Sequence, residues 1–363
     1  MAPVKNGRVV YKEVPSGYPE PGKTLVYDES QTIDLDNVSL HGGILTKTLS
    51  LSLDPFLRGK MRDSKIKSYS PAFVLGEPIY NDGVSIVLRS ENKSVQAGDH
   101  VISNISAQLL ICSFSSPWVQ RIRATDFQEY SVISSESKWT VVENEHNLSW
   151  GAFLGVLGMP GHTAYSGWRE FAFPEKGDVV FVSAGAGTVG SLVIQIAKSE
   201  GLKVVASAGS DDKVDFIRSL GADVAFNYKK QKTSDVLAKE GPINIYWDNV
   251  GGETLDAALA ATAGRARIIC CGHISDYNAD KPSSITNLGL AVSRELRISG
   301  FLIASIWPKY EKKFYDELPK AVASGNIKHV VHETKGLEKT GQAFKDMLTG
   351  VTSGKNIVVV AEK

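Results

Sequence analysis

The pattern of apolar and polar positions changes character near residue 150. Before it, short alternating runs predict β-strands, of which the clearest is Thr46 to Leu53. In this run the alternation places Leu49, Leu51 and Leu53 on one face and the intervening Thr and Ser residues on the other. Further strands are predicted at 84–88, 100–103 and 128–133. After residue 150, apolar strands alternate with amphipathic helices, which predicts a doubly wound parallel sheet.

The second half begins with a β-branched run at 178–184, typical of a buried parallel strand. Apolar residues then recur at helical spacing from Val189 to Ala197, as in a helix that lies on a sheet. The remaining predicted elements are a strand at 203–208, a helix at 211–220, strands at 223–226, 244–248 and 266–271, a helix at 340–348 and a strand at 356–361.

Three glycines separate the first strand of this half from its helix. Gly185, Gly187 and Gly190 have the spacing of a dinucleotide-binding turn. In this setting Gly185 permits the tight turn, Gly187 lets the backbone approach the phosphates, and Gly190 lets the helix pack close to the strand. The sequence therefore predicts a pyrophosphate at the helix N-terminus, against the alternative of a glycine-rich turn without a ligand.

The end of the next strand indicates which dinucleotide binds. An NAD site places a carboxylate there to accept from the ribose 2′-OH, whereas this chain has Ala208-Gly209-Ser210. Lys213 and Tyr228 follow, so a hydroxyl, a cation and a phenol can surround a 2′-phosphate. This favours NADP(H), although Lys213 could instead be a solvated helix lysine.

Composition narrows the class of protein. The chain has 363 residues, which favours two domains, with 42% hydrophobic residues and equal numbers of acidic and basic ones. A net charge of zero gives the protein no electrostatic reason to bind nucleic acid or an anionic membrane. No apolar run is long enough for a membrane span, and no signal-peptide core precedes the first strands, so a cytoplasmic protein is expected.

The sequence does not predict a metal site. Of its three cysteines, Cys112 is isolated, while Cys270 and Cys271 are adjacent in a strand and point to opposite faces. The histidines show no ligand pairing at helical spacing, so zinc is not expected.

Several long motifs resemble one protein family. They are Asp54–Gly59, Gly155–Tyr165, Ala184–Gly190, Ala208–Lys213, Val224–Tyr228, Asp248–Gly252, Cys271–Asn278 and Gly354–Asn356. With these motifs the chain resembles the medium-chain dehydrogenase/reductase superfamily, and within it the zinc-independent NADPH-dependent alkenal/one double-bond and prostaglandin reductases.

The resemblance implies a GroES-like β domain and a Rossmann domain. The expected division is 1–148 for the first part of the β domain, 149–315 for the NADP-binding domain, and 316–363 for the return to the β domain. Zinc-dependent relatives carry Gly-His-Glu early in the β domain, whereas this chain has Gly76-Glu77-Pro78. A homodimer is also expected from the family.

The resemblance also assigns site residues. Besides Gly185, Gly187, Gly190, Ser210, Lys213 and Tyr228, the residues expected to line NADP(H) are Met159, Thr188, Val189, Asn249, Cys271, Phe301, Ile303 and Asn356. Tyr277 is expected near the nicotinamide, where a donor would stabilise the enolate that forms when hydride reaches the β-carbon of an enone. The proton for the α-carbon could come from this phenol or from water. Alternatively, Tyr277 is a packing residue.

The substrate pocket is expected to include Phe56, Tyr80 and Met159. Many relatives have Asp-Pro-Tyr where this chain has Phe56, so a second phenol is absent and the pocket is expected to be more apolar. Arg58 is expected to be structural, paired with Asp54 or a neighbour.

The leading hypothesis is therefore an NADPH-dependent reductase of the carbon–carbon double bond in α,β-unsaturated aldehydes and ketones. If the protein is an enzyme, the alternative reaction is the reduction of quinones or carbonyl groups, since one fold can support several reactions. A non-catalytic NADPH-binding protein is the alternative from another class.

Overall fold

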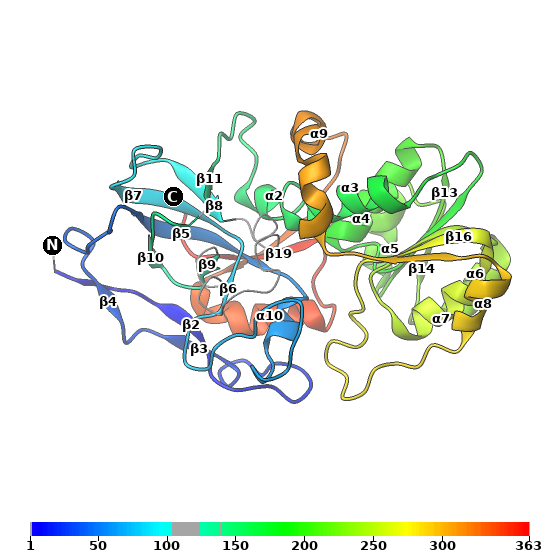
Figure 1. Cartoon of the computed structure of the whole chain (residues 1–363), viewed down its shortest axis with the longest axis horizontal. Helices are drawn as coiled ribbons and strands as arrows, with labels where there is room; N and C mark the ends of the chain where they lie inside the picture. Colours follow the sequence, from blue (N-terminus) through cyan, green and yellow to red (C-terminus); the bar gives the residue numbers. More distant parts are fainter. Residues whose placement is uncertain (1, 104–123, 138, 363) are drawn as a thin grey trace. The chain divides into compact units, whose positions relative to one another are not determined.

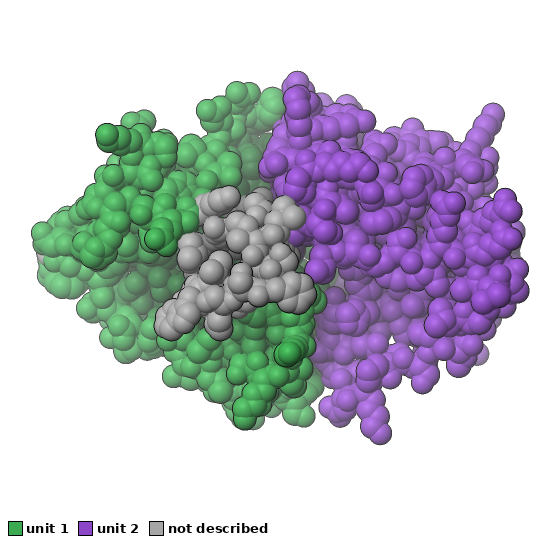
Figure 2. Space-filling model, viewed as in Figure 1, with its two compact units in different colours: residues 1–154, 331–363 green, residues 155–330 purple. Residues whose placement is uncertain are grey.

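The computed structural model describes residues 2–103, 124–137 and 139–362, which form two compact units (Figure 2). Unit 1 comprises residues 1–154 and 331–363, and unit 2 comprises residues 155–330. The boundaries predicted at 148 and 315 are therefore displaced. Helix α2 (Trp150–Leu154) stays with unit 1, because Leu154 packs against Leu49 and Ile357. The predicted boundary at 315 falls inside helix α9 (Ile303–Ala323), whose aromatic side chains pack on α3 (Met159–Phe171).

Unit 2 contains a parallel six-stranded sheet (Figure 1). Its spatial order is β14-β13-β12-β15-β16-β17, so the order reverses between β12 and β15. Ligands of doubly wound sheets bind at the carboxyl ends of the strands where the order reverses. The strands are β12 (Val179–Val182), β13 (Lys203–Ala208), β14 (Val224–Asn227), β15 (Ile243–Asp248), β16 (Thr262–Cys270) and β17 (Arg297–Gly300).

Helices cover both faces of this sheet. Helices α6 and α7 bury Leu237 and Leu259 against one face, together with Phe181, Tyr246 and Ile268. Helices α4 and α5 pack on β12, β13 and β14. The helices besides α3 and α9 are α4 (Thr188–Ser199), α5 (Asp211–Ser219), α6 (Thr233–Glu240), α7 (Gly252–Ala260) and α8 (Leu290–Ser293), with a 3-10 turn at Asn287–Gly289. The predicted elements from 178 to 271 thus form, with ends that differ by a few residues.

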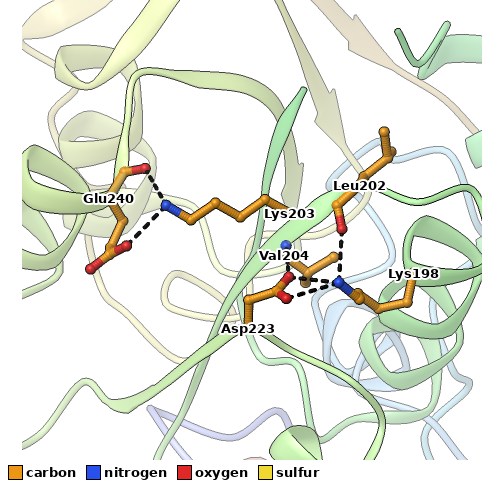
Figure 3. Close-up of polar contacts among 6 residues, drawn as sticks. All are labelled: Lys198, Leu202, Lys203, Val204, Asp223 and Glu240. Atoms are coloured by element: carbon orange, nitrogen blue, oxygen red, sulfur yellow. Dashed lines mark hydrogen bonds and ion pairs between the residues drawn. The ribbon is translucent and has the colours of Figure 1, made fainter. Parts of the chain in front are cut away.

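Ion pairs tie the amino-terminal end of this sheet (Figure 3). Lys198 Nζ donates to the Leu202 carbonyl at 3.0 Å and to both carboxylate oxygens of Asp223. Asp223 also accepts the Val204 N–H at 2.7 Å, and Lys203 Nζ donates to Glu240. These contacts join the end of α4 to the starts of β13 and β14. They lie at the amino-terminal ends of the strands, whereas the ligand is expected at the carboxyl ends.

Unit 1 is built on a second, mixed sheet with the order β11-β8-β7-β5-β19-β18, and β10 also pairs with β5. Its strands are β5 (Ile44–Leu53), β7 (Gly83–Ser90), β8 (His100–Ser103), β10 (Tyr130–Ile133), β11 (Trp139–Val141), β18 (Val331–Lys335) and β19 (Lys355–Val359). Two-stranded sheets pair β1 (Val4–Lys5) with β4 (Thr32–Ile33), β2 (Arg8–Tyr11) with β3 (Leu25–Asp28), and β6 (Tyr80–Asn81) with β9 (Thr125–Asp126).

Two helices pack in the core of unit 1. Helix α10 (Thr340–Leu348) has the predicted bounds and buries Phe344 and Met347 beside Leu25. Helix α1 (Leu57–Lys60) is a single turn that buries Leu57 in the same cluster, and a 3-10 turn spans Leu337–Lys339. No helix among the described residues is long and apolar enough to cross a membrane.

The central strand β5 departs from the predicted alternation. Leu51 and Leu53 pack in one core cluster, but Leu49 packs in another, with Val84 and Leu154. The pairing register with β7 shifts between Thr48 and Ser50, and such a bulge breaks the two-residue period. The predicted common face of the three leucines is therefore wrong. The polar residues of this strand are buried as well, since neighbouring strands and helices cover both faces.

Lys60 is an unusual member of the core of unit 1. It is 2% exposed, and its ammonium group lies 3.6 Å from the ring centroid of Tyr80 and 4.6 Å from that of Phe73. Burial lowers its pKa to about 7, with a further lowering by Arg62 that Asp82 opposes. Contact with two aromatic faces partly replaces the lost hydration of the cation.

We expect Lys60 to make stability depend on pH. Its pKa is about 7 in the folded protein, against 10.5 ordinarily, so between these values the unfolded chain binds more protons and stability rises with pH. Lys60→Met should remove this rise and should raise the melting temperature most at pH 7 and below. Thermal unfolding of both proteins from pH 6 to pH 10 measures the difference. A constant difference across this range would contradict a low pKa for Lys60.

Candidate functional site

The turn between β12 and α4 has the shape of a phosphate cradle. A Cβ atom at Gly190 would lie 2.6 Å from the Ala184 carbonyl oxygen and 2.9 Å from the Gly185 Cα, so only glycine allows this approach. Gly187 is the extended N-cap of α4, and the first N–H groups of that helix have no intrahelical acceptor. These N–H groups and the helix dipole suit an anion.

The roles of the other two glycines differ in part from the prediction. The left-handed residue of the turn is Ala184, with φ 49°, and not Gly185. Gly185 is required for a different reason, because a Cβ there would meet Ile194 at 3.0 Å and Ala206 at 3.3 Å. Its N–H donates to the Ser207 carbonyl, which joins the turn to the end of β13. At Gly187 the nearest atom to an added Cβ is 3.4 Å away, so the backbone there is open to a ligand.

A buried polar network holds the point where the strand order reverses. Tyr246 donates its hydroxyl to Asp248 Oδ1 at 2.6 Å and lies 3.0 Å from Ser183 Oγ. The same carboxylate oxygen accepts the N–H groups of Val250 and Gly251. Burial raises the pKa of Asp248, although these hydrogen bonds favour its charged form. The network fixes the ends of β12 and β15 and the loop that follows.

Asn249 and Cys271 directly follow β15 and β16, at the carboxyl ends of these strands. Asn249 donates Nδ2–H to the Ser183 carbonyl at 2.7 Å and accepts from Trp247 Nε1 at 3.1 Å, so its amide joins β12 to β15. Cys271 follows β16, and its N–H donates to the Asp248 carbonyl. Burial raises the pKa of its thiol to about 12, so this cysteine is not a thiolate nucleophile.

Two of the predicted 2′-phosphate residues, Ser210 and Tyr228, lie beside the turn after β13, and Lys213 is in the first turn of α5. A Cβ at Gly209 would be 3.0 Å from the Tyr228 hydroxyl, so this phenol lies against the turn, and the Tyr228 ring is half exposed. Ser210 is the N-cap of α5, and its hydroxyl makes no capping hydrogen bond. Burial and then repulsion from Lys229 lower the pKa of Lys213. A dianion bound here would offset that repulsion.

The Asp211 carboxylate is engaged by side chains beyond α5. Asp211 and Asp212 lie in the first turn of α5, as the sequence predicts. Asp211 accepts from Asn227 at 3.0 Å and from Lys230 at 2.5 Å. Its oxygens are therefore engaged by the strand end and the loop after it.

Tyr277 lies in the loop after β16. Its N–H donates to the Ile274 carbonyl, its ring packs edge-on against His273 at 4.8 Å, and a Cβ at Gly272 would lie 3.5 Å from its hydroxyl. Gly272 in turn donates to the Asp248 carbonyl. The phenol is thus held close to the carboxyl ends of β15 and β16, and it is partly buried.

The other expected cofactor residues are distributed over both units. Thr188 and Val189 form the first turn of α4, while Met159 and Ile303 begin α3 and α9. Phe301 packs against Trp247 and Phe171. Asn356 belongs to unit 1, where it lies on β19 opposite Leu53, is 6% exposed and has no hydrogen-bond partner for Oδ1.

The expected substrate residues are likewise divided. Phe56 and Tyr80 pack against the same core cluster of unit 1, whereas Met159 belongs to unit 2. Tyr80 additionally lies under the Lys60 ammonium group. Arg58 is structural, with hydrogen bonds to the carbonyls of Gly17 and Pro15. Asp54 makes a buried ion pair with Lys355.

Metal ligands do not gather in the part of the chain that the structure describes, where no three His, Cys, Asp or Glu side chains could hold an ion. Cys112 lies outside the described residues. Burial raises the pKa of Cys270 to about 11, so this thiol is neutral as well.

Sequence reasoning missed Ser183, Tyr246 and the two buried lysines, Lys60 and Lys355. Tyr246 and Asp248 stand two residues apart in an apolar strand, which places both on one face, and this spacing could have revealed their hydrogen bond. No comparable spacing in the sequence indicates the partners of Lys60 and Lys355.

Comparisons with known proteins agree with this geometry. Residues 188–323 match the family model described as zinc-binding dehydrogenase, and residues 8–118 match that of the N-terminal domain of oxidoreductase. The NADP-dependent oxidoreductase RED1 of Cochliobolus heterostrophus is 38% identical, over 99% of this chain and 98% of that protein. The NADP(+)-dependent 2-alkenal reductase of Nicotiana tabacum is 36% identical, over 99% of each chain.

A solved structure extends the likeness to three dimensions. CurA from Vibrio vulnificus in complex with NADPH has a TM-score of 0.84 and 29% identity, covering 98% of this chain and 100% of that one. The predicted fold class, a Rossmann domain with a GroES-like domain, is confirmed. The chain belongs to the medium-chain dehydrogenase/reductase superfamily, within the group that contains the NADPH-dependent double-bond reductases.

Proposed function

We propose that this protein is an NADPH-dependent reductase of the carbon–carbon double bond in α,β-unsaturated aldehydes and ketones. The observation that carries the proposal is a dinucleotide cradle that ends in a lysine, a serine and a phenol, with a second phenol at the carboxyl ends of β15 and β16. The 2-alkenal reductase and the NADPH-bound CurA structure among its relatives support the same assignment.

The preference for NADP(H) follows from charge. The residues after β13 offer Lys213 and the Ser210 and Tyr228 hydroxyls, while the Asp211 carboxylate is engaged by Asn227 and Lys230. A 2′-phosphate gains charge-assisted hydrogen bonds from such a set. An NAD site has a carboxylate at the end of this strand for the ribose 2′-OH, and this chain has Ala208-Gly209-Ser210 there.

The reaction needs a hydride donor and a site that stabilises the charge which appears on the substrate. The bound cofactor supplies the hydride. Tyr277 donates its hydroxyl to the substrate carbonyl oxygen, where negative charge develops as the β-carbon is reduced. The α-carbon then takes a proton from the same phenol or from water. Phe56, Tyr80 and Met159 provide apolar contacts to the substrate.

The homodimer and the cytoplasmic location stay predictions from the sequence.

A substrate panel tests the proposed reaction. NADPH consumption should be measured with enals, enones, quinones and saturated ketones, and the products should show which bond was reduced. We expect the saturated aldehyde or ketone from enals and enones, and no turnover of saturated ketones. Turnover of quinones or saturated ketones alone would replace the proposal by the alternative chemistry, and no turnover at all would favour a binding protein.

Lys213→Ala should weaken NADPH binding by about 1–3 kcal/mol, because it removes a charge-assisted contact to the 2′-phosphate. NADH binding should barely change. Titration of the reduced cofactors by fluorescence measures both affinities. Lys239→Ala is the control, because this exposed lysine of α6 pairs only loosely with Glu240. Equal losses for NADPH and NADH would contradict the assignment of Lys213.

Tyr277→Phe keeps the ring and removes the hydroxyl, so kcat should fall roughly ten- to a thousand-fold while NADPH affinity stays nearly unchanged. The matched control is Tyr310→Phe, since Tyr310 donates its hydroxyl to Glu170 on the surface of unit 2. Single-turnover kinetics with a good enone measure the chemical step. If Tyr277→Phe retains the full kcat on every reducible substrate, the phenol is a packing residue.

A further inference from the structure

The loop that carries Tyr277 is bound to the loop after β15. Ser275 donates twice to the Val250 carbonyl, through its N–H at 3.1 Å and through its hydroxyl at 2.7 Å. One residue earlier, the Ile274 N–H donates to the Asn249 carbonyl at 3.3 Å. These hydrogen bonds connect two segments of unit 2 that are 25 positions apart in the sequence. Ser275 stands two residues before Tyr277, so the attachment lies close to the phenol along the chain.

Val250 is itself held by a buried carboxylate. Its N–H donates to Asp248 Oδ1 at 2.9 Å, while its carbonyl accepts the two hydrogen bonds from Ser275. Asp248 is 2% exposed, and the Tyr246 hydroxyl donates to the same carboxylate oxygen. A continuous series of hydrogen bonds therefore leads from the buried end of β15 to Ser275, in the loop of Tyr277.

Two glycines allow the two loops to approach one another. A Cβ at Gly251 would lie 2.9 Å from the Cβ of His273, and a Cβ at Gly252 would lie 2.9 Å from Ser275 Oγ. Such distances are too short for a carbon contact, so a side chain at either position would push the loops apart. Because both positions are glycine, the Ser275 hydroxyl can reach the Val250 carbonyl.

Other hydrogen bonds order the Tyr277 loop internally. The Tyr277 N–H donates to the Ile274 carbonyl at 3.4 Å, which is long for a bond of this kind. Asp276 Oδ1 accepts from the Ser283 hydroxyl at 2.5 Å and from the Ser283 N–H at 3.3 Å. These contacts close the loop on itself, whereas the Ser275 hydroxyl fastens it to the loop after β15.

We propose that Ser275 is a positioning residue for Tyr277: its hydroxyl, bound to the Val250 carbonyl, holds the loop so that the phenol meets the substrate carbonyl oxygen. The inference rests on the proposed function, because it takes Tyr277 to donate to that oxygen. Ser275 acts through Tyr277 and does not itself contact the substrate. A donor stabilises the developing charge only from the correct position, so a small displacement of the phenol lowers the rate.

Ser275→Ala removes the hydroxyl and leaves the backbone hydrogen bond to Val250. Because this side chain is exposed, the melting temperature should stay near that of the wild type. Hydride transfer in a single turnover should slow about three- to tenfold, since one neutral hydrogen bond is lost, while the Kd for NADPH stays unchanged. Ser275→Thr retains the hydroxyl and should retain the wild-type rate.

A double-variant cycle separates positioning from a general effect on the protein. In the Tyr277→Phe background, Ser275→Ala should cause no further loss of rate, because both substitutions act on one interaction. Multiplying losses, an unchanged rate in Ser275→Ala, or a raised Kd for NADPH would overturn the positioning role. None of these results would touch the proposed reaction, which the wild-type substrate panel decides. Full activity of Tyr277→Phe would overturn the role of the phenol, and the role of Ser275 with it.

Ser219→Ala is the matched control, since Ser219 is an exposed serine whose hydroxyl donates to the Phe216 carbonyl at the same distance, 2.7 Å. It should leave the rate unchanged. Hydrogen–deuterium exchange then tests the attachment without turnover. In Ser275→Ala the amides of residues 272–279 should exchange faster than in the wild type, while those of β12 should not change. Equal exchange of residues 272–279 in the two proteins would overturn the proposal.

Discussion

The hydrogen bonds that converge on Asp248 fix the loops at the carboxyl ends of β15 and β16. A carboxylate at the end of β15 binds the Tyr246 hydroxyl within its own strand and two N–H groups of the following loop. Its backbone carbonyl accepts two more N–H groups, from Cys271 and Gly272 after β16. One residue thereby fixes two neighbouring strand ends. Ser183 extends the same control to β12, since it bonds to both the backbone and the side chain of Asn249.

This arrangement explains why the loops can be rich in glycine and still be well defined. Gly251 and Gly252 adopt left-handed conformations, with φ 73° and 51°, which cost other residues steric strain. The backbone of a glycine has more conformational freedom than that of other residues, so a glycine-rich loop is less ordered by itself. The Asp248 carboxylate restricts this loop by accepting a hydrogen bond from the Gly251 N–H. The buried network and the glycines are therefore two parts of one device. Loops ordered in this way hold their backbone groups in place with little dependence on flexible side chains.

The parallel sheet could be predicted from the sequence because its strands and helices follow from local patterns. The β-branched run before Gly185 and the helical spacing after it each depend on neighbours a few residues apart. Strand β5 shows where this reasoning ends, since its bulge depends on pairing with β7 and moves Leu49 to a second core cluster. The domain boundary at 315 failed for a similar reason. Packing of α9 on α3 keeps the whole helix in unit 2, and no turn residue marks that contact in the sequence.

The buried lysines were beyond sequence reasoning for a different physical reason. Lysine is normally solvated, so a pattern assigns it to the surface unless a partner is known. The partner of Lys355 is a carboxylate 301 positions away, and the partners of Lys60 are the rings of Phe73 and Tyr80. Both cations lie in unit 1, where strands cover the polar residues of β5 as well. In unit 2 the Asp248 carboxylate fixes backbone groups of two loops, whereas in unit 1 the Lys355 ammonium group binds the Asp54 carboxylate and the Leu53 carbonyl.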